Sequence, residues 1–213
     1  IMGLIGPNGS GKTTLLNVLN GVHKSTAGDV RLRGASLKGL RPHALVARGI
    51  SRTFQNPHVF DTVTVFQNML VPMLHHRDGR SGRIRDRAGA MLEFVGLSGF
   101  CDRAASELSG GQQKLLEFAR ALMSEPVLIL MDEPFAGIHP EIKALLIERI
   151  ARTRETSGTS FIIVSHEIPD LLMLSDAVVC MAAGCVISSG RPAEVASDER
   201  VVEAYLGHGI SSR

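Results

Sequence analysis

The sequence has 213 residues, of which 44% are hydrophobic and 21% charged, and these proportions are ordinary for a globular protein with one large core. Its 23 basic and 21 acidic side chains leave a formal charge of +2, and so even a balance gives no reason to expect a nucleic-acid partner. The cysteines Cys101, Cys180 and Cys185 have neither metal-ligand nor disulfide spacing, so we expect reduced thiols. The longest apolar run, 177–187, is about half of what a membrane-spanning helix needs, and no signal peptide is visible.

The chain opens with the pattern of a strand, a glycine-rich loop and a helix. Ile1–Ile5 is a short apolar run of the kind that forms a buried strand. Apolar residues at helical spacing follow the loop and stop at Gly21. The intervening loop, 6–14, fits Gly-x-x-x-x-Gly-Lys-Ser/Thr, the pattern of a phosphate-binding loop.

The chemistry of phosphate binding explains these residue types. Small residues let backbone N–H groups turn toward a phosphate, and the following helix adds the positive end of its dipole. Lys12 would bring a positive charge to the outer phosphates, and the Thr13 hydroxyl would coordinate Mg²⁺. The predicted nucleotide-binding residues of this loop are Gly6, Asn8, Gly9, Ser10, Gly11, Lys12, Thr13 and Thr14. An ordinary glycine-rich turn is the alternative, but the pattern and its context favour a nucleoside triphosphate site.

Short elements are predicted next. Val30–Leu32 alternates with charged residues and predicts a strand with one exposed face, and Pro42 opens a helix that runs through Arg48. Residues 50–55 predict a strand that carries Gln55 to its carboxyl end.

From about Thr64 to Met123 the pattern is mostly helical. Thr64 can cap a first helix, Ala88–Val95 has the spacing of a second, and a third follows Ser109. We predict that 64–123 is a helical subdomain inserted into a nucleotide-binding α/β core made of 1–63 and 124–213.

The α/β pattern then resumes. Residues 127–131 and 161–164 read as strands buried on both faces, and Pro140 opens a helix between them. A hairpin over 178–187 and a last helix around 201–205 complete the chain. Strands that alternate with helices predict a mainly parallel sheet with right-handed crossovers.

A second motif, Leu-Ser-Gly-Gly-Gln-Gln-Lys, covers 108–114 at the start of a helix. Ser109 and Gln112 have the spacing of a capping box, which is a purely structural interpretation. The same residues also place a hydroxyl and unobstructed N–H groups at a helix N-terminus, which is a second anion site. Two such sites in one chain suggest that one of them serves the nucleotide of a neighbouring molecule.

Together with the phosphate loop and Leu128–Pro134, this motif closely resembles the ABC ATPases, in the family's order and over nearly the whole chain. The resemblance implies a P-loop NTPase fold, ATP hydrolysis, and ATP and Mg²⁺ as cofactors. It implies that Asp132 organises Mg²⁺ with Thr13 and Gln55. It also implies that Glu133 polarises the attacking water and that His166 hydrogen-bonds the γ-phosphate.

The resemblance also implies an assembly. A second ABC ATPase subunit, identical or homologous, would sandwich two ATP molecules with this chain, and permease subunits would hold both at the cytoplasmic face of a bacterial inner membrane. A solute-binding protein would take part indirectly. The residues that would reach the partner subunit's nucleotide are Ser109, Gly110, Gly111 and Gln112.

Four stretches are especially similar to the ATPase subunits of branched-chain amino acid importers: Arg52–Gln55, Val59–Phe60, Thr62–Asn68 and the terminal Ala204–Gly207. Import of an amide, urea or another small solute remains an alternative. A non-transport ABC ATPase acting on DNA or the ribosome should show a long coiled-coil insertion or two cassettes, and neither is present. A non-enzymatic module should have lost its catalytic residues, and these are retained.

The sequence also departs from the family pattern. The family usually has Asp or Asn at the position of His139, so we expect this histidine to preserve dimerisation and alter coupling between the two sites, with a charge that varies with pH. The aromatic residue that stacks on adenine belongs upstream of Ile1, and because the chain does not begin with Met we expect an N-terminal portion to be missing. His75 and His76 lack metal-like companions, and we expect them at the surface.

Overall fold

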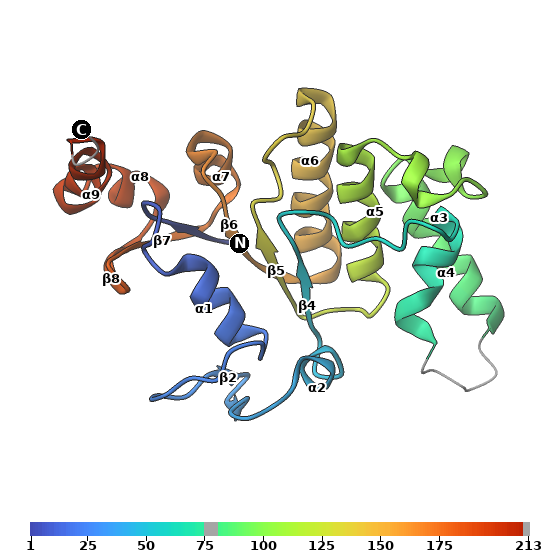
Figure 1. The fold of residues 1–213 in the computed structure, drawn as a ribbon, viewed down its shortest axis with the longest axis horizontal. Coiled ribbons are helices and arrows are strands. Elements are labelled where there is room, and N and C mark those ends of the chain that lie inside the picture. Colours follow the sequence, from blue (N-terminus) through green and yellow to red (C-terminus); the bar gives the residue numbers. More distant parts are fainter. Residues whose placement is uncertain (75–80, 211–213) are drawn as a thin grey trace.

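The computed structural model describes residues 1–74 and 81–210, and it places a central sheet between two layers of helices (Figure 1). His75 and His76 lie outside the described residues. The strands are β1 (Met2–Ile5), β2 (Arg31–Leu32), β3 (Ala35–Ser36), β4 (Ile50–Thr53), β5 (Leu128–Asp132), β6 (Ser160–Val164), β7 (Ala177–Ala182) and β8 (Cys185–Gly190). The helices are α1 (Lys12–Leu19), α2 (Pro42–Val46), α3 (Val65–Leu70), α4 (Ser81–Phe94), α5 (Gly110–Leu122), α6 (Pro140–Ser157), α7 (Ile168–Leu174), α8 (Pro192–Ala196) and α9 (Glu199–Ile210), with short 3₁₀ turns at Val71–Met73, Ser98–Phe100 and Ala105–Glu107.

The main sheet has six strands in the order β4-β5-β6-β1-β7-β8, and only β8 runs antiparallel to its neighbour. The predicted mainly parallel sheet is therefore confirmed. In this register Val164 of β6 lies beside both Leu4 of β1 and Asp132 of β5. The carboxyl ends of these three strands consequently meet at one edge, where ligands of parallel sheets bind.

The apolar runs of the central strands are continuous because both faces of the sheet are covered. Leu130 and Leu4 point into a core shared with α1 and α2. Ile129, Met131 and Ile163 point the other way, into a larger core built with α3 to α7. Figure 1 shows the same division, with α1 and α2 on one side of the sheet and α5, α6 and α7 on the other.

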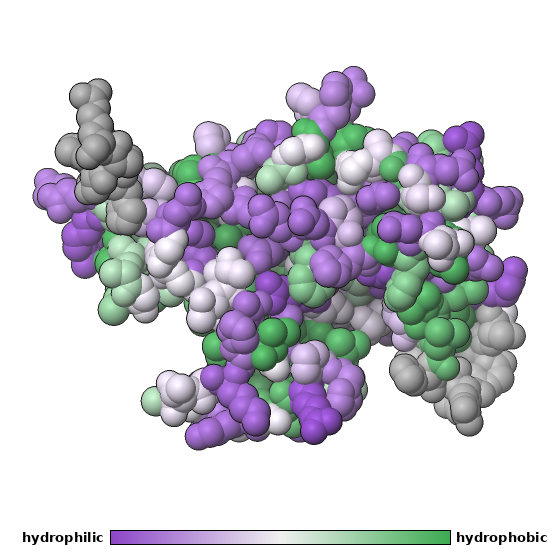
Figure 2. Space-filling model, viewed as in Figure 1, coloured by the Kyte–Doolittle hydropathy of each residue, from purple (hydrophilic) through white to green (hydrophobic). Residues whose placement is uncertain are grey.

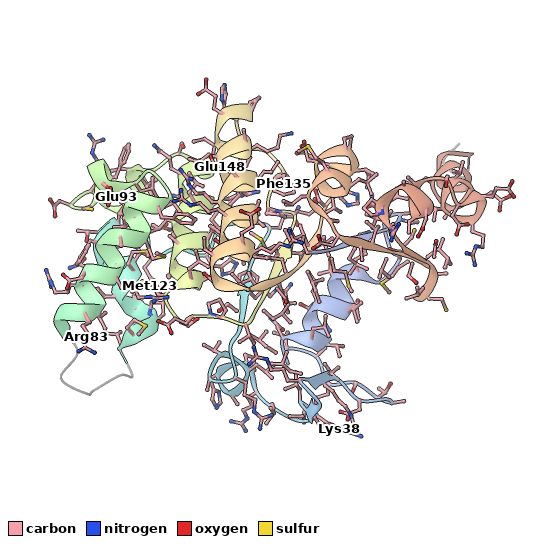
Figure 3. All side chains as sticks on the ribbon, turned by 180° about the vertical axis from the view of Figure 1, so that it is seen from behind. Lys38, Arg83, Glu93, Met123, Phe135 and Glu148 are labelled. Atoms are coloured by element: carbon pink, nitrogen blue, oxygen red, sulfur yellow. The ribbon has the colours of Figure 1, made fainter. Side chains whose placement is uncertain are left out.

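Side chains divide between core and solvent as this layering requires. Phe135 is fully buried, whereas the charged side chains of Lys38, Arg83 and Glu93 extend into solvent (Figure 3). None of the helices in 1–74 and 81–210 has the combined length and hydropathy needed to cross a bilayer.

Some predicted elements extend beyond those in the structure, and some elements of the structure were not predicted. The helix predicted over 42–48 ends at Val46, because the chain turns at Gly49 with a φ of 85°. The strand predicted over 50–55 ends at Thr53, which leaves Gln55 in the following loop. Helices α7 and α8 and strand β3 were not predicted, since each is too short to show a clear period.

The helical block 64–123 packs closely on the rest of the chain. Thr64 caps α3 as predicted and does so in a capping box, and Ser109 forms the predicted capping box of α5. Helix α5 contacts β4 and α6 as well as α3 and α4. Its separation as a subdomain stays a prediction.

We predict that Leu116→Ala lowers the free energy of unfolding by about 2–5 kcal/mol, because Leu116 is fully buried in the larger core and its removal leaves a cavity. Urea unfolding followed by circular dichroism would measure the change. The exposed Val22 is the control, and Val22→Ala should change stability by no more than about 0.5 kcal/mol. Equal effects of the two substitutions would contradict this description of the core.

Candidate active site

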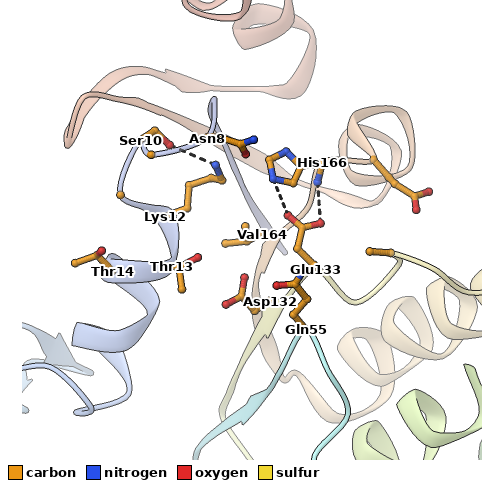
Figure 4. A pocket seen from close by; sticks show the side chains of 14 residues that line it. Asn8, Ser10, Lys12, Thr13, Thr14, Gln55, Asp132, Glu133, Val164 and His166 are labelled. Atoms are coloured by element: carbon orange, nitrogen blue, oxygen red, sulfur yellow. Dashed lines mark hydrogen bonds and ion pairs between the residues drawn. The ribbon is translucent and has the colours of Figure 1, made fainter. Parts of the chain in front are cut away.

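A pocket of about 470 Å³ lies at the carboxyl edge of β1, β5 and β6 (Figure 4). Its lining residues are Asn8, Gly9, Ser10, Gly11, Lys12, Thr13, Thr14, Gln55, Asp132, Glu133, Ala136, Val164, His166 and Glu167. The structure thus brings together the predicted phosphate-loop residues, apart from Gly6, with the predicted catalytic and metal-binding residues. Gly6 lies buried at the base of the loop.

The phosphate loop has a backbone that only glycine suits at two points. Gly6 has a φ of 148°, and a Cβ atom there would lie 2.1 Å from the carbonyl oxygen of Met181. Gly11 has a φ of 98° and precedes the first residue of α1. The strand can therefore turn sharply into the helix and point the helix N-terminus at the pocket.

The side chain of Lys12 is held over the phosphate loop by backbone carbonyl groups of that loop. Its Nζ donates hydrogen bonds to the carbonyl oxygens of Gly6 at 2.7 Å and Pro7 at 3.0 Å. Burial lowers the pKa of the Lys12 ammonium, while Glu133 and then Asp132 act in the opposite direction. A phosphate would supply the counter-charge that this buried ammonium lacks.

Asp132 is paired with a buried arginine from the neighbouring strand. Arg52 Nη2 lies 3.1 Å from Asp132 Oδ2, and Arg52 Nη1 donates to Asn17 Oδ1 at 2.6 Å. The pair joins β4, β5 and α1 beneath the pocket. From the sequence, Arg52 stands out only as part of a family-like run, because Asn17 and Asp132 are distant from it in the chain.

Glu133 combines a strained backbone with a fixed carboxylate. Its φ is 48°, in the left-handed region that side chains other than glycine rarely adopt. Its Oε2 accepts a hydrogen bond from the backbone N–H of His166 at 3.0 Å, and its Oε1 lies 3.4 Å from His166 Nε2 (Figure 4). Oε1 is buried against His166 and accepts no hydrogen bond, so it is an acceptor that a water could bond only once the His166 ring turned away.

The donors around the pocket fit a magnesium ion bound jointly with phosphates. Thr13 has an exposed hydroxyl at the start of α1, and Asp132 and Gln55 line the same pocket. Within 1–74 and 81–210 no three His, Cys, Asp or Glu side chains gather as a metal cage. Mg²⁺ commonly takes one or two protein ligands and completes its shell with phosphate oxygens and water.

The four residues predicted to act in trans are not among the pocket's lining. Ser109 is exposed, and its Oγ accepts from the N–H of Gln112 at 3.3 Å, while Gln112 Oε1 accepts from the N–H of Ser109 at 2.9 Å. Gly111 packs on α6, where an added Cβ would lie 3.1 Å from Ile142. His139 is exposed at the start of α6 and forms no side-chain cap there.

Two supports of the site had not been recognised from the sequence. The Tyr205 hydroxyl, from α9, accepts a hydrogen bond from the N–H of Gly6 at 2.8 Å. Lys114, from α5, donates to the carbonyl oxygens of Glu133 at 3.0 Å and Ala136 at 2.6 Å. Only the fold reveals these contacts, because each joins residues that are far apart in the chain.

The sheet topology and the phosphate loop at its edge define a P-loop nucleoside triphosphatase. The family profile described as ABC transporter matches residues 1–136, and one described as branched-chain amino acid ATP-binding cassette transporter matches residues 185–210. The chain therefore belongs to the ABC transporter family of ATP-hydrolysing subunits, as predicted.

Individual relatives are similar in sequence to this chain over nearly its whole length. The chain is 38% identical over 215 residues to the probable branched-chain amino acid transport ATP-binding protein LivG of Archaeoglobus fulgidus, covering 96% of this chain and 83% of that one. It is 34% identical over 223 residues to the high-affinity branched-chain amino acid transport ATP-binding protein LivG of Escherichia coli K12, covering 97% and 87%.

Solved structures give the same picture. The ADP conformation of an ATP-binding cassette of an ABC transporter superposes with a TM-score of 0.85 at 36% identity, covering 97% of this chain and 87% of that one. A dimeric cassette in a post-hydrolysis state, bound to ADP and Pi, gives a TM-score of 0.80 at 26% identity, covering 90% and 85%.

We predict that Lys12→Ala weakens the binding of ATP by about ten- to a hundredfold, because it removes a charged hydrogen-bond donor from the phosphates. Isothermal titration calorimetry of the purified subunit would measure the affinity. Lys38→Ala, which removes a lysine exposed to solvent, should bind as the wild type does. Unchanged affinity in the Lys12 variant would refute the assignment of this loop.

Proposed function

We propose that this chain is the ATPase subunit of an importer for branched-chain amino acids. The observation that carries the solute class is the similarity, over nearly the full length, to relatives named for branched-chain amino acid transport. The match of the C-terminal segment to a profile of that same transporter class supports it. The predicted family-like stretch 204–207 lies within this C-terminal match, and those between 52 and 68 lie within the match to the ABC transporter profile.

In the proposed reaction, the phosphates of ATP bind to the backbone N–H groups of 6–14, and Lys12 leaves its carbonyl partners to contact the outer phosphates. Thr13, Gln55 and Asp132 would hold Mg²⁺. The ion, when bound, neutralises charge on the β- and γ-phosphates. Arg52 keeps the Asp132 carboxylate directed at the pocket.

Glu133 and His166 complete the chemistry from the other wall of the pocket. Once His166 turned away from it, Oε1 of Glu133 would accept a hydrogen bond from the attacking water and orient it toward the γ-phosphorus. His166, whose side chain is 52% exposed, is free to rotate from Glu133 toward the γ-phosphate. Positioning and electrostatics of this kind supply most of the catalysis in phosphoryl transfer.

The proposed assembly pairs this pocket with a second ABC ATPase subunit. Ser109, Gly110, Gly111 and Gln112 are away from their own chain's pocket, and Ser109 and Gly110 are exposed, which supports a contact with the nucleotide held by the partner subunit. The similarity to a dimeric cassette is consistent with this arrangement. The partner can be a second copy or a homologous subunit.

Permease subunits would anchor the pair at the cytoplasmic face of a bacterial inner membrane, with a solute-binding protein acting on the far side. Hydrophobic side chains gather at the surface over α3 and α4 (Figure 2). Two exposed apolar side chains flank α3 in the sequence: Phe60, at 49% exposure, precedes it, and Leu74, at 70%, follows it. Exposed apolar side chains of this kind suit a membrane-bound partner.

Reconstitution of the subunit with its permeases and solute-binding protein in proteoliposomes tests the solute class. Leucine, isoleucine or valine should stimulate ATP hydrolysis, whereas urea and short amides should not. Stimulation by urea or an amide in place of the amino acids would overturn the proposed substrate and favour the alternative importer.

We predict that Glu133→Gln retains ATP binding, stabilises the ATP-bound dimer and lowers turnover by about 10²- to 10⁴-fold, because the amide cannot accept a proton from water. Phosphate release by the reconstituted transporter measures turnover, and gel filtration with ATP measures dimerisation. Near-normal phosphate release would remove Glu133 from the role of general base.

We predict that His139→Asn changes the ATPase rate of the transporter within about pH 6 to 8, because it replaces an exposed imidazole at the start of α6 with a shorter amide side chain. The two pH–rate profiles would be compared at saturating ATP. Coincident profiles would show that His139 has no part in coupling the two sites.

A further inference from the structure

Helix α5 buries a row of three charged side chains, each one turn from the next: Lys114, Glu117 and Arg120. Lys114 and Glu117 are among the buried residues of the chain, and Arg120 is half-buried. Buried charges destabilise a protein unless their partners compensate for the lost hydration. The groups that these three side chains hydrogen-bond therefore indicate why the charges are buried.

Glu117 is bonded to the loop that carries Gln55. Only 3% exposed, it accepts a hydrogen bond on Oε2 from the N–H of Phe54 at 3.3 Å. Its other oxygen, Oε1, accepts from the N–H of His58 at 3.1 Å. The two bonded residues flank Gln55, so one carboxylate fixes both ends of the short loop.

Arg120 fastens the same loop from the next turn of α5. Its guanidinium donates to the carbonyl oxygen of His58 and, at 3.4 Å, to Asn68 Oδ1. Asn68 in turn binds both the N–H and the carbonyl oxygen of Phe60, at 2.9 and 3.0 Å. The loop and the chain that follows it are thus tied to α5 by charged and polar side chains.

Lys114 makes the corresponding attachment to the loop that carries Glu133, through the carbonyl oxygens of Glu133 and Ala136. One helix therefore holds two of the loops that line the pocket, the one with Gln55 and the one with Glu133. The N-terminus of that helix begins after Ser109.

We propose that Glu117 is a positioning residue for ATP hydrolysis: it holds Gln55 in the pocket and joins that loop to the helix that begins after Ser109. The inference rests on the proposed function, in which Gln55 contacts the magnesium ion and the attacking water. Movement of Ser109 toward or away from a partner would then pull on Gln55 through a single rigid helix. A hydrophobic residue at 117 would fill the core and leave the two N–H groups unpaired.

The alternative is that Glu117 only stabilises the fold. Each of its two oxygens accepts an N–H group, an arrangement that suits a carboxylate, whereas burial raises the pKa of the carboxyl and therefore disfavours the charged form. If Glu117 only stabilised the fold, its substitution would lower stability and would affect kcat equally whether or not Gln55 is present. If Glu117 positions Gln55, its substitution should lower kcat only when Gln55 is present.

A double-mutant cycle on the reconstituted transporter separates these possibilities. Glu117→Gln keeps the shape of the side chain but turns an NH₂ toward one of the two N–H groups, so one hydrogen bond is lost. We expect kcat to fall by about ten- to a hundredfold and the Mg²⁺ concentration for half-maximal rate to rise, with little change in nucleotide affinity measured without Mg²⁺. In a Gln55→Ala background, Glu117→Gln should have almost no further effect on kcat.

Glu93→Gln is the matched control, since Glu93 is an exposed carboxylate on α4, and its kcat should equal that of the wild type. If Glu117→Gln does not fold, Arg120→Ala, which removes the donor to the His58 carbonyl oxygen, should likewise have almost no further effect on kcat in the Gln55→Ala background. Unchanged kcat in Glu117→Gln, or full additivity of either substitution with Gln55→Ala, would overturn the proposal. These rates are read without regard to which solute is transported, so failure of the proposed amino acid specificity would remain a separate result.

Discussion

The parallel pairing of β1, β5 and β6 is the constraint on which the site depends. Its register places Val164 beside Leu4 on one side and beside Asp132 on the other, so three chain segments leave the sheet at one edge. The phosphate loop, the carboxylates and His166 follow directly from these exits. A shift of one residue in this register would reverse which side chains face each core, so the two apolar layers also fix the position of the catalytic groups.

Several features around the pocket lower the stability of the fold. Lys12 is buried with backbone carbonyls as partners, Glu133 has a left-handed backbone, and α5 carries charges into the interior. Each feature is less stable than an apolar or relaxed substitute would be. Each also holds a polar group in the position needed by ATP or water. This concentration of unfavourable features is what a preorganised electrostatic site requires.

Much of this arrangement could be predicted from the sequence, because the motifs are local and their chemistry demands particular residues. The phosphate loop, the buried strands, the helix cap at Thr64 and the capping box at Ser109 all depend on residues that lie close together in the sequence. The supports of the site could not be predicted in this way. Arg52 and Glu117 find their partners 80 and 63 residues away, and a charged residue on a strand or helix normally indicates a solvated face. Their roles become visible only when the sheet order is known.

The central claim is that the pocket is half of a site completed by another subunit. The most direct test is a structure of the assembled transporter carrying Glu133→Gln, determined with ATP and Mg²⁺. The account predicts that Ser109 Oγ lies within hydrogen-bond distance of the γ-phosphate of a nucleotide held by the phosphate loop of the other ATPase subunit. A bound ATP whose phosphates are enclosed by one chain alone, with Ser109 still exposed to solvent, would contradict it.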